Sequence, residues 1–196
     1  MRKEIEKLLY ELNVPRETFF KLEEYVSLLV KWNKTINLIS KNDIQDIWTK
    51  HIMICAEIIR YIKDKNITLV DLGSGSGLPG IILSILGVRK TILIESNTKK
   101  AAFLLQATRI SNFSVEIIND RIQRQQIQCD IVTSRALASI NTLLEYRKYV
   151  KFKKFMLLIK GLNPHLEIPT TSKFSFQVFP SKYNSSSNIV IISPSI

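Results

Sequence analysis

The heptapeptide Asp71-Leu72-Gly73-Ser74-Gly75-Ser76-Gly77 decides the fold of this chain. It completes an apolar run of β-forming residues at positions 67–72, and a helix can begin shortly after it at Pro79, because proline suits the first turn of a helix. Glycine allows a tight turn and leaves room for a ligand, since it has no Cβ. A glycine turn between a strand and a helix predicts a ligand site at the carboxyl end of the first strand of an α/β sheet.

Beyond this turn, short β-rich runs alternate with helical segments. The runs that predict strands are residues 67–72, 91–95, 115–118, 130–133 and 155–160. The segments that predict helices are residues 79–86, 98–109 and 140–149. Two later apolar runs, 174–179 and 189–192, predict a terminal antiparallel hairpin. Because alternating strands and helices form βαβ units, we expect a mainly parallel seven-stranded sheet with helices on both faces.

The chain before the glycine turn is helical in pattern. Apolar residues recur at helical spacing in residues 5–12, 19–30 and 44–62, with a polar connection at 31–38. We expect residues 1–66 to form an N-terminal helical appendage and residues 67–196 to form one compact domain. A chain of 196 residues that is 45% hydrophobic is long enough for one substantial core.

The net charge of +11, from 28 basic and 17 acidic residues, indicates a polyanionic partner. Residues 1–66 contribute 12 basic and 10 acidic side chains, so 16 basic and 7 acidic ones follow the appendage. Five of those cations crowd one stretch that also holds aromatic residues: Arg147, Lys148, Lys151, Lys153 and Lys154. This stretch is either a nucleic-acid contact or an ordinary solvated face.

Several classes of protein are disfavoured by composition. No run approaches the 18 apolar residues of a membrane span, and the first residues are charged where a signal peptide is apolar. Cys55 and Cys129 are far apart, and His51 and His165 are the two histidines, so we expect reduced structural thiols and no metal site. We therefore expect a soluble, cytoplasmic and monomeric protein.

The spacing within the turn separates two kinds of cofactor. A dinucleotide fingerprint would need glycine at position 78, which is Leu78. The spacing Asp71-x-Gly73-x-Gly75-x-Gly77 is instead typical of methyltransferases that bind S-adenosylmethionine (SAM). The sulfonium of SAM is positive, so an acid near the turn suits it, although Asp71 can also serve as a plain turn acceptor. Glu95, at the end of the second predicted strand, is placed to bind both ribose hydroxyls.

A wider set of motifs carries a resemblance to one family. They are Asp71-Leu72-Gly73-Ser74-Gly75-Ser76-Gly77-Leu78-Pro79-Gly80-Ile81, Trp32-Asn33-Lys34, Asn37-Leu38, Thr133-Ser134-Arg135-Ala136 and Lys160-Gly161. Over residues 32–161 the chain closely resembles the bacterial 16S rRNA methyltransferase G family, also called glucose-inhibited division protein B. The resemblance implies a Rossmann-like class I SAM-dependent fold. It also implies methylation of N7 of the guanine at position 527 of 16S rRNA in the small ribosomal subunit.

The resemblance also assigns expected roles to individual residues. Those implied to contact the cofactor, beside the turn and Glu95, are Gly73, Leu78, Ile122, Gln123 and Arg135. Those implied to face the RNA are Asn37, Lys99, Lys100, Arg121, Arg135 and Lys160.

Two departures from the family pattern put roles in doubt. After His51 the family usually has an Asp-Ser pair, whereas this chain has Ile52-Met53-Ile54-Cys55, which weakens any role for His51. Before the last strand an arginine is common, but here Ser187 and Asn188 take that place. The phosphate contact of that arginine is then either lost or supplied by Lys182.

The chemistry of guanine N7 agrees with these residues independently. N7 has an in-plane lone pair and loses no proton on methylation, so proximity and alignment suffice and no general base is needed. Thr133-Ser134-Arg135-Ala136 does not match the motif of exocyclic-amine methyltransferases. Two alternatives stay open: a SAM-dependent methyltransferase of another substrate, and a catalytically degenerate RNA-binding homologue.

Overall fold

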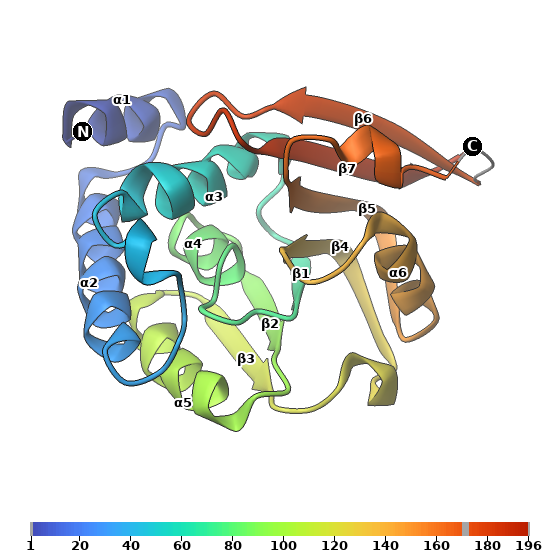
Figure 1. Ribbon diagram of the computed structural model, residues 1–196, viewed down its shortest axis with the longest axis horizontal. Coiled ribbons are helices and arrows are strands. Elements are labelled where there is room, and N and C mark those ends of the chain that lie inside the picture. The colour runs from blue at the N-terminus through green and yellow to red at the C-terminus, as the bar shows by residue number, and fades with distance from the viewer. Residues whose placement is uncertain (1, 170–172, 196) are drawn as a thin grey trace.

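The fold is a seven-stranded sheet with helices on both faces, seen in a computed structural model that describes residues 2–169 and 173–195 (Figure 1). The sheet order is β3-β2-β1-β4-β5-β7-β6. Strands β1 to β5 are parallel, and β7 is antiparallel to both of its neighbours. The strands are β1 (Thr68–Leu72), β2 (Lys90–Ile94), β3 (Ser114–Ile118), β4 (Ile127–Arg135), β5 (Val150–Lys160), β6 (Phe174–Pro180) and β7 (Asn188–Pro194). The predicted sheet and its terminal hairpin are confirmed.

Strands β4 and β5 begin earlier than their apolar runs predict. The first part of β5, residues 150–155, pairs with β4, whereas β7 joins β5 from Met156 onward. That part of β5 carries exposed lysines, which interrupt the apolar pattern. The sequence therefore reveals the fully buried half of each strand and hides the other half.

The helices cover the two faces unequally. They are α1 (Arg2–Glu11), α2 (Arg16–Asn33), α3 (Met53–Glu57), α4 (Gly80–Ile85), α5 (Thr98–Ala107) and α6 (Ile140–Glu145). One large apolar cluster includes side chains from α1 to α5 and one face of the sheet, and a second cluster joins α6 to the other face. In Figure 1, α2, α4 and α5 accordingly lie together, away from α6.

The third predicted helix, at 44–62, is not continuous. A short 3-10 helix (Lys41–Asp43) and a turn lead into a π-helix (Trp48–Ile52), which continues as α3 and ends in a 3-10 helix (Ile58–Tyr61). Lys50 and His51, both in the π-helix, bond to Asp43, so contacts outside the helix compete with regular helical geometry. The expected connection at 31–38 also starts late, because α2 continues through Asn33.

The N-terminal helices share their core with the sheet. Ile5, Leu22 and Tyr25 belong to the same apolar cluster as Leu69 and Ile81. The division at residue 66 stays a prediction about folding units, since the packing across it is continuous. None of the helices in the described ranges has the length and apolar character needed to span a membrane.

Candidate active site

The glycine turn follows β1 and has two sides with different neighbours. Gly73, Gly75 and Gly77 all have positive φ angles, of 64°, 55° and 84°, which L side chains rarely adopt. Gly73 and Gly75 line a pocket. A Cβ on Gly77 would instead lie 2.6 Å from Ile81 Cγ1, inside the core. Two of the three glycines therefore face a ligand site, and the third lets the turn pack against α4.

Glu95 lies directly behind this turn. Its Oε2 accepts a hydrogen bond from the Gly75 backbone N–H at 2.8 Å, and its Oε1 accepts one from Asn97 N–H at 2.7 Å. The carboxylate is buried, and its backbone oxygen accepts from the Asn119 side chain. The predicted ribose acid is thus fixed beside a glycine that lines the pocket.

Asp71 lies beneath the turn and does not line the pocket. The side chain is fully buried, and its Oδ2 accepts a hydrogen bond from Gly80 N–H at 3.2 Å. Burial raises the pKa of Asp71 to about 7. A Cβ on Gly80 would lie 2.8 Å from the same carboxylate oxygen, which explains glycine at that position. This geometry matches the turn-acceptor interpretation of Asp71.

The pocket has a volume of about 230 Å³ and lies where β1 and β4 end. The chain leaves β1 toward β2 and β3 and later returns on the other side at β4, so this is the switch point where open α/β sheets bind ligands. Five segments meet there. The lining residues are Leu38, Ile39, His51, Gly73, Ser74, Gly75, Ser76, Leu78, Lys100, Arg135 and Ala136.

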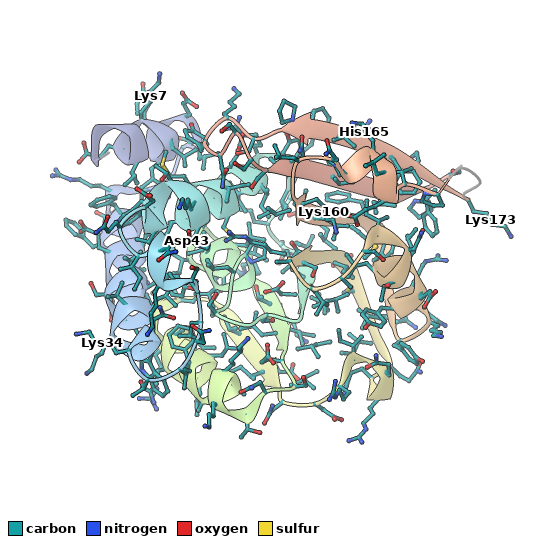
Figure 2. The ribbon with its side chains drawn as sticks, in the orientation of Figure 1. Lys7, Lys34, Asp43, Lys160, His165 and Lys173 are labelled. Atoms are coloured by element: carbon teal, nitrogen blue, oxygen red, sulfur yellow. The ribbon has the colours of Figure 1, made fainter. Side chains whose placement is uncertain are left out.

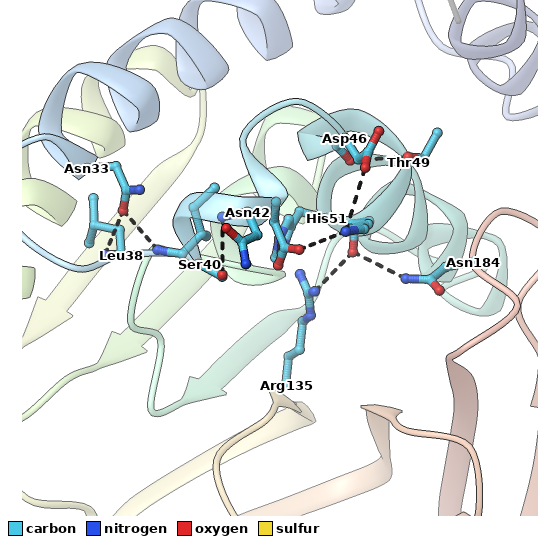
Figure 3. Close-up of polar contacts among 12 residues, drawn as sticks. Asn33, Leu38, Ser40, Asn42, Asp46, Thr49, His51, Arg135 and Asn184 are labelled. Atoms are coloured by element: carbon cyan, nitrogen blue, oxygen red, sulfur yellow. Dashed lines mark hydrogen bonds and ion pairs between the residues drawn. The ribbon is translucent and has the colours of Figure 1, made fainter.

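Arg135 ends β4 and reaches toward the π-helix (Figure 3). Its Nη2 donates to the Lys50 carbonyl oxygen at 3.0 Å, and its Nη1 lies 3.9 Å from the Cys55 sulfur. The next residue, Ala136, has a φ of 53°, a strained value for a residue with a Cβ. The side chain that the resemblance assigned to cofactor and substrate is therefore held in place by the appendage.

His51 also lines the pocket, although the sequence departure beside it weakened any role. Its Nε2 lies 3.1 Å from Asp43 Oδ2, while its Nδ1 is buried and has no hydrogen-bond partner among the described residues. Burial, followed by the positive charge of Arg135, lowers the pKa of His51 to about 4. The imidazole is therefore neutral near pH 7.

The other predicted positions are distributed around the pocket. Lys100 lines it, whereas Lys99 is exposed at the start of α5, where Asn97 caps the helix. Arg121 and Asn37 are also exposed and outside the lining. Of the adenine pair, Ile122 is buried, and Gln123 is exposed with its Nε2 3.4 Å from the Tyr146 hydroxyl.

Lys160 is a bonded residue and does not present a free cation. Its Nζ lies 2.7 Å from Glu167 Oε2 and donates to the Ala138 carbonyl oxygen at 2.8 Å. Glu167 Oε2 also accepts from Ile140 N–H at 2.9 Å, and the Lys160 side chain is only 11% exposed. Lys160 thus fastens the loop that follows Arg135.

Three polar residues that shape the site were missed by the sequence reasoning. Asn33 Oδ1 accepts from Leu38 N–H and Ile39 N–H, at 2.8 and 3.0 Å, and so brings that loop to the pocket. The Tyr25 hydroxyl donates to the Ser76 carbonyl oxygen at 2.5 Å, and Asp43 holds His51. All three lie in the helical segment, where the Trp32-Asn33-Lys34 and Asn37-Leu38 motifs gave a signal but none of the three contacts was predicted.

Comparison with known proteins places this chain in a family. Residues 19–188 match the family described as rRNA small subunit methyltransferase G. The chain belongs to this family.

Relatives of the methyltransferase G family match most of the chain. The protein named ribosomal RNA small subunit methyltransferase G from Orientia tsutsugamushi (strain Boryong) is 48% identical over 183 residues, covering 92% of each chain. The protein of the same name from Rickettsia africae (strain ESF-5) is 47% identical over 157 residues, covering 80% of this chain and 82% of its own.

Solved structures show the same fold at low sequence identity. A ribosomal protein L11 methylase from Lactobacillus delbrueckii subsp. bulgaricus has a TM-score of 0.60 at 13% identity, covering 75% of this chain and 80% of its own. Magnesium protoporphyrin IX methyltransferase from Synechocystis PCC 6803, solved with bound SAM, has a TM-score of 0.58 at 12% identity, covering 82% and 86%. This methyltransferase G chain therefore has the Rossmann-like class I fold of SAM-dependent methyltransferases.

The basic stretch at 147–154 lies at the opposite edge of the sheet from the pocket. Lys151 is near the start of β5 and Lys160 is at its end, a separation of about 30 Å along a strand. Figure 2 shows Lys173, which adjoins Phe174 on that side, at the far end of the molecule from Asp43. The Arg147 guanidinium lies 5.3 Å from the centre of the Phe174 ring. These cations are therefore not part of the pocket of this methyltransferase G chain.

The described residues hold neither a metal-binding cluster nor an ionised thiol. Among residues 2–169 and 173–195, no group of three or more His, Cys, Asp or Glu side chains is arranged to hold a metal ion. Cys55 and Cys129 are free and buried, and burial raises their thiol pKa values to about 11 and about 12. Both cysteines are therefore packed, protonated thiols near pH 7.

Proposed function

We propose that this protein transfers the methyl group of SAM to N7 of the guanine at position 527 of 16S rRNA in the small ribosomal subunit. The observation that carries the proposal is the pocket at the β1/β4 switch point, where the glycine turn meets Arg135 and Lys100. Membership of the methyltransferase G family supports SAM-dependent methylation of ribosomal RNA. The choice of N7 and of position 527 follows from the family resemblance and from the chemistry below.

The residues at the turn fit SAM. Gly73 and Gly75 leave open backbone beside the pocket, and Glu95 places a carboxylate behind them for the ribose hydroxyls. Leu78 would contact the cofactor at the turn, and Ile122 and Gln123 would contact the adenine. SAM supplies the reactive methyl group when bound.

The pocket suits a reaction without proton transfer. Asp71 is buried away from it, and no carboxylate of the described residues lines it. Guanine N7 needs no deprotonation, so the protein's task is to hold the base in line with the methyl group and to exclude water. Leu38, Ile39 and Leu78 give the pocket the apolar wall for that task.

Charged and polar residues would position the RNA. Lys100 and Arg135 line the pocket directly, and Lys99, Arg121 and Asn37 are exposed outside its lining and would contact the phosphate backbone. Lys160 would act indirectly, because its bonds to Glu167 and Ala138 fix the loop after Arg135.

The test is methylation of small ribosomal subunits that lack the modification. The protein is incubated with methyl-labelled SAM, and the RNA is cleaved at N7-methylguanine to locate the label. We expect one labelled guanine, at position 527. Label at another base would indicate another substrate, and SAM binding without any label would indicate a homologue that has lost catalysis.

A further inference from the structure

One polar atom in the pocket wall has no partner. The Nδ1 atom of His51 is buried, and none of the described residues donates to it or accepts from it. The residue as a whole is 8% exposed, and it belongs to the lining of the pocket. A buried polar atom without a hydrogen bond is unfavourable, so on a residue that lines a pocket such an atom indicates a bond made by the ligand.

The neighbours of His51 decide what Nδ1 can do. Asp43 is ionised near pH 7, because its hydrogen bond with Lys50 holds its pKa below the usual value. An ionised carboxylate can only accept, so the Nε2 of His51 must carry the hydrogen that points to Asp43 Oδ2. Since the imidazole is neutral, Nδ1 keeps its lone pair. His51 therefore presents a hydrogen-bond acceptor.

A donor lies beside this acceptor. Arg135 lines the same pocket, and its Nη2 bonds to the backbone carbonyl of Lys50, the residue that precedes His51. Arg135 uses Nη2 and Nη1 toward Lys50 and Cys55, and its remaining N–H groups are available to a ligand. Figure 3 shows Arg135 and His51 converging from β4 and from the π-helix.

An adjacent donor and acceptor match guanine and mismatch adenine. Guanine presents O6, an acceptor, next to N1–H, a donor, on the side of the ring that continues from N7. Adenine has the reverse pattern, an N6 amine donor beside an unprotonated N1. An adenine in the pocket would therefore place its N6 donor against the Arg135 donor and its N1 acceptor against the His51 acceptor.

We propose that His51 Nδ1 accepts a hydrogen bond from N1–H of the methylated guanine while Arg135 donates to its O6. The inference rests on the proposed function and adds the residue that selects the base. The π-helix positions both groups that would bind the base, because it carries His51 and the Lys50 carbonyl that accepts a hydrogen bond from Arg135. A site that pairs with both groups of guanine rejects a base that cannot complete those bonds.

Two substitutions of His51 separate this role from a structural one. The amide of asparagine lies one bond beyond Cγ, where Nδ1 of histidine lies, and the amide of glutamine lies one bond further, near Nε2. His51→Asn can therefore keep the contact with the base, and His51→Gln can keep the contact with Asp43. The two roles predict opposite results for the same pair of variants.

The experiment measures single-turnover methylation of small subunits carrying guanine or adenine at position 527, together with SAM affinity and melting. We expect His51→Gln to bind SAM as the wild type does, to lose about 100-fold in rate on guanine, and to lose little of its residual rate on adenine. We expect His51→Asn to stay within about 10-fold of the wild type on guanine. Both expectations convert to about 2.7 and 1.4 kcal/mol in activation free energy.

Three results overturn the inference. The first is His51→Gln with full guanine activity, and the second is an equal loss on guanine and adenine, which a general distortion would cause. The third is His51→Asn falling further than His51→Gln, which would leave His51 a packing residue held by Asp43. A wild-type protein that methylates no guanine would instead overturn the proposed function itself, and the inference with it.

Discussion

The two edges of the parallel sheet both carry basic residues, but in different states. At the carboxyl edge, Arg135 and Lys160 are partly buried and bonded to backbone carbonyls. At the amino edge, Lys151, Lys153 and Lys154 are exposed, and no ion pair is formed by them within the described ranges. The density of positive charge in the sequence therefore does not locate the pocket. The cations beside the pocket are distinguished by being partly buried and bonded to backbone carbonyls.

The lysines of the amino edge have a structural explanation. Within the described residues, positions 150–155 of β5 have no partner strand on the side of β7, so that side of the strand is unpaired. Lys153 and Lys154 together face the single residue Asp130 in a β-bulge, because Cys129 pairs with Phe152 and Ile131 with Phe155. Lysines and bulges on an unpaired side of a strand prevent pairing with strands of other chains. The amino edge is thus protected against strand pairing, whereas the carboxyl edge carries the pocket.

The largest effect is expected at the glycine turn. Gly73→Asp should abolish detectable SAM binding, a loss of at least about 100-fold, because a Cβ there would lie 2.5 Å from Leu137 Cδ1 and the φ of 64° disfavours a side chain. Isothermal calorimetry measures this. Gly161→Asp is the control, since no atom lies within 4 Å of a Cβ at Gly161. Unchanged affinity in a folded Gly73 variant would remove the turn from the cofactor site.

The next effect concerns one bonded and one exposed cation. Arg135→Ala should lower the rate of methyl transfer by about 100-fold, equivalent to about 2.7 kcal/mol, because both the base contact and the link to Lys50 are lost. Lys151→Ala, at the amino edge, should change the rate by less than about 2-fold. The assay is single-turnover methylation with melting as a check on folding, and full turnover by Arg135→Ala would contradict the assignment.

A third effect is the dependence of stability on pH. The pKa of His51 is about 4 when folded and about 6.5 when unfolded, so the unfolded chain binds the proton more tightly. The stability associated with His51 is present above pH 6.5 and is lost as the pH falls toward 4, by up to about 3 kcal/mol.

Asp71 acts in the opposite sense. Its raised pKa gives stability that is lost as the pH rises from about 4 to about 7.

The contribution of His51 is measured by denaturant unfolding of His51→Gln. This variant should lose less stability on acidification than the wild type, because it lacks the imidazole that becomes protonated on unfolding. Lys151→Gln should run parallel to the wild type, and parallel curves for all three proteins would show that His51 is not buried as described.

The smallest effect is expected when the amino edge loses its charge. Replacing Lys151, Lys153 and Lys154 by glutamine should leave RNA affinity within about 2-fold and should increase aggregation. Replacing Lys99 and Lys100 should reduce the slope of log affinity against log salt by about 0.7 to 0.9 for each lost phosphate contact. An equal reduction in slope in the triple variant would mean that RNA reaches the amino edge.

The sequence predicted best the strands whose residues form an uninterrupted β-forming run. Strands β1 and β2 were predicted to within about one residue, because a buried parallel strand is a nearly continuous apolar run, and the exposed to half-buried edge strand β3 was predicted equally well from its β-branched residues. The start of β5 was not predicted, because the lysines in its unpaired part interrupt the apolar pattern of the core. The irregular segment around the π-helix was predicted as plain helix, because its geometry depends on the contacts of Asp43.

The candidate site was predicted in part for a related reason. Gly73, Leu78 and Arg135 lie in motifs that can be recognised locally, and all three line the pocket. Ile39 and His51 reach the pocket from the helical segment through hydrogen bonds to Asn33 and Asp43, which are far from the glycine turn in sequence. Asn33 lies in the Trp32-Asn33-Lys34 motif, but its contact with Ile39 and the contact of Asp43 with His51 depend on tertiary packing and have no local pattern.

The hydrogen bond from Tyr25 to the Ser76 carbonyl joins α2 to the glycine turn, and this has a thermodynamic consequence. A ligand that orders the turn should also stabilise the packing of α2, and by reciprocity a loosened α2 should lower the affinity for that ligand. Amide hydrogens in the middle of α2 should therefore exchange more slowly when SAM is bound. Tyr25→Phe should remove this coupling, so that SAM still slows amide exchange in the glycine turn and no longer slows it in α2.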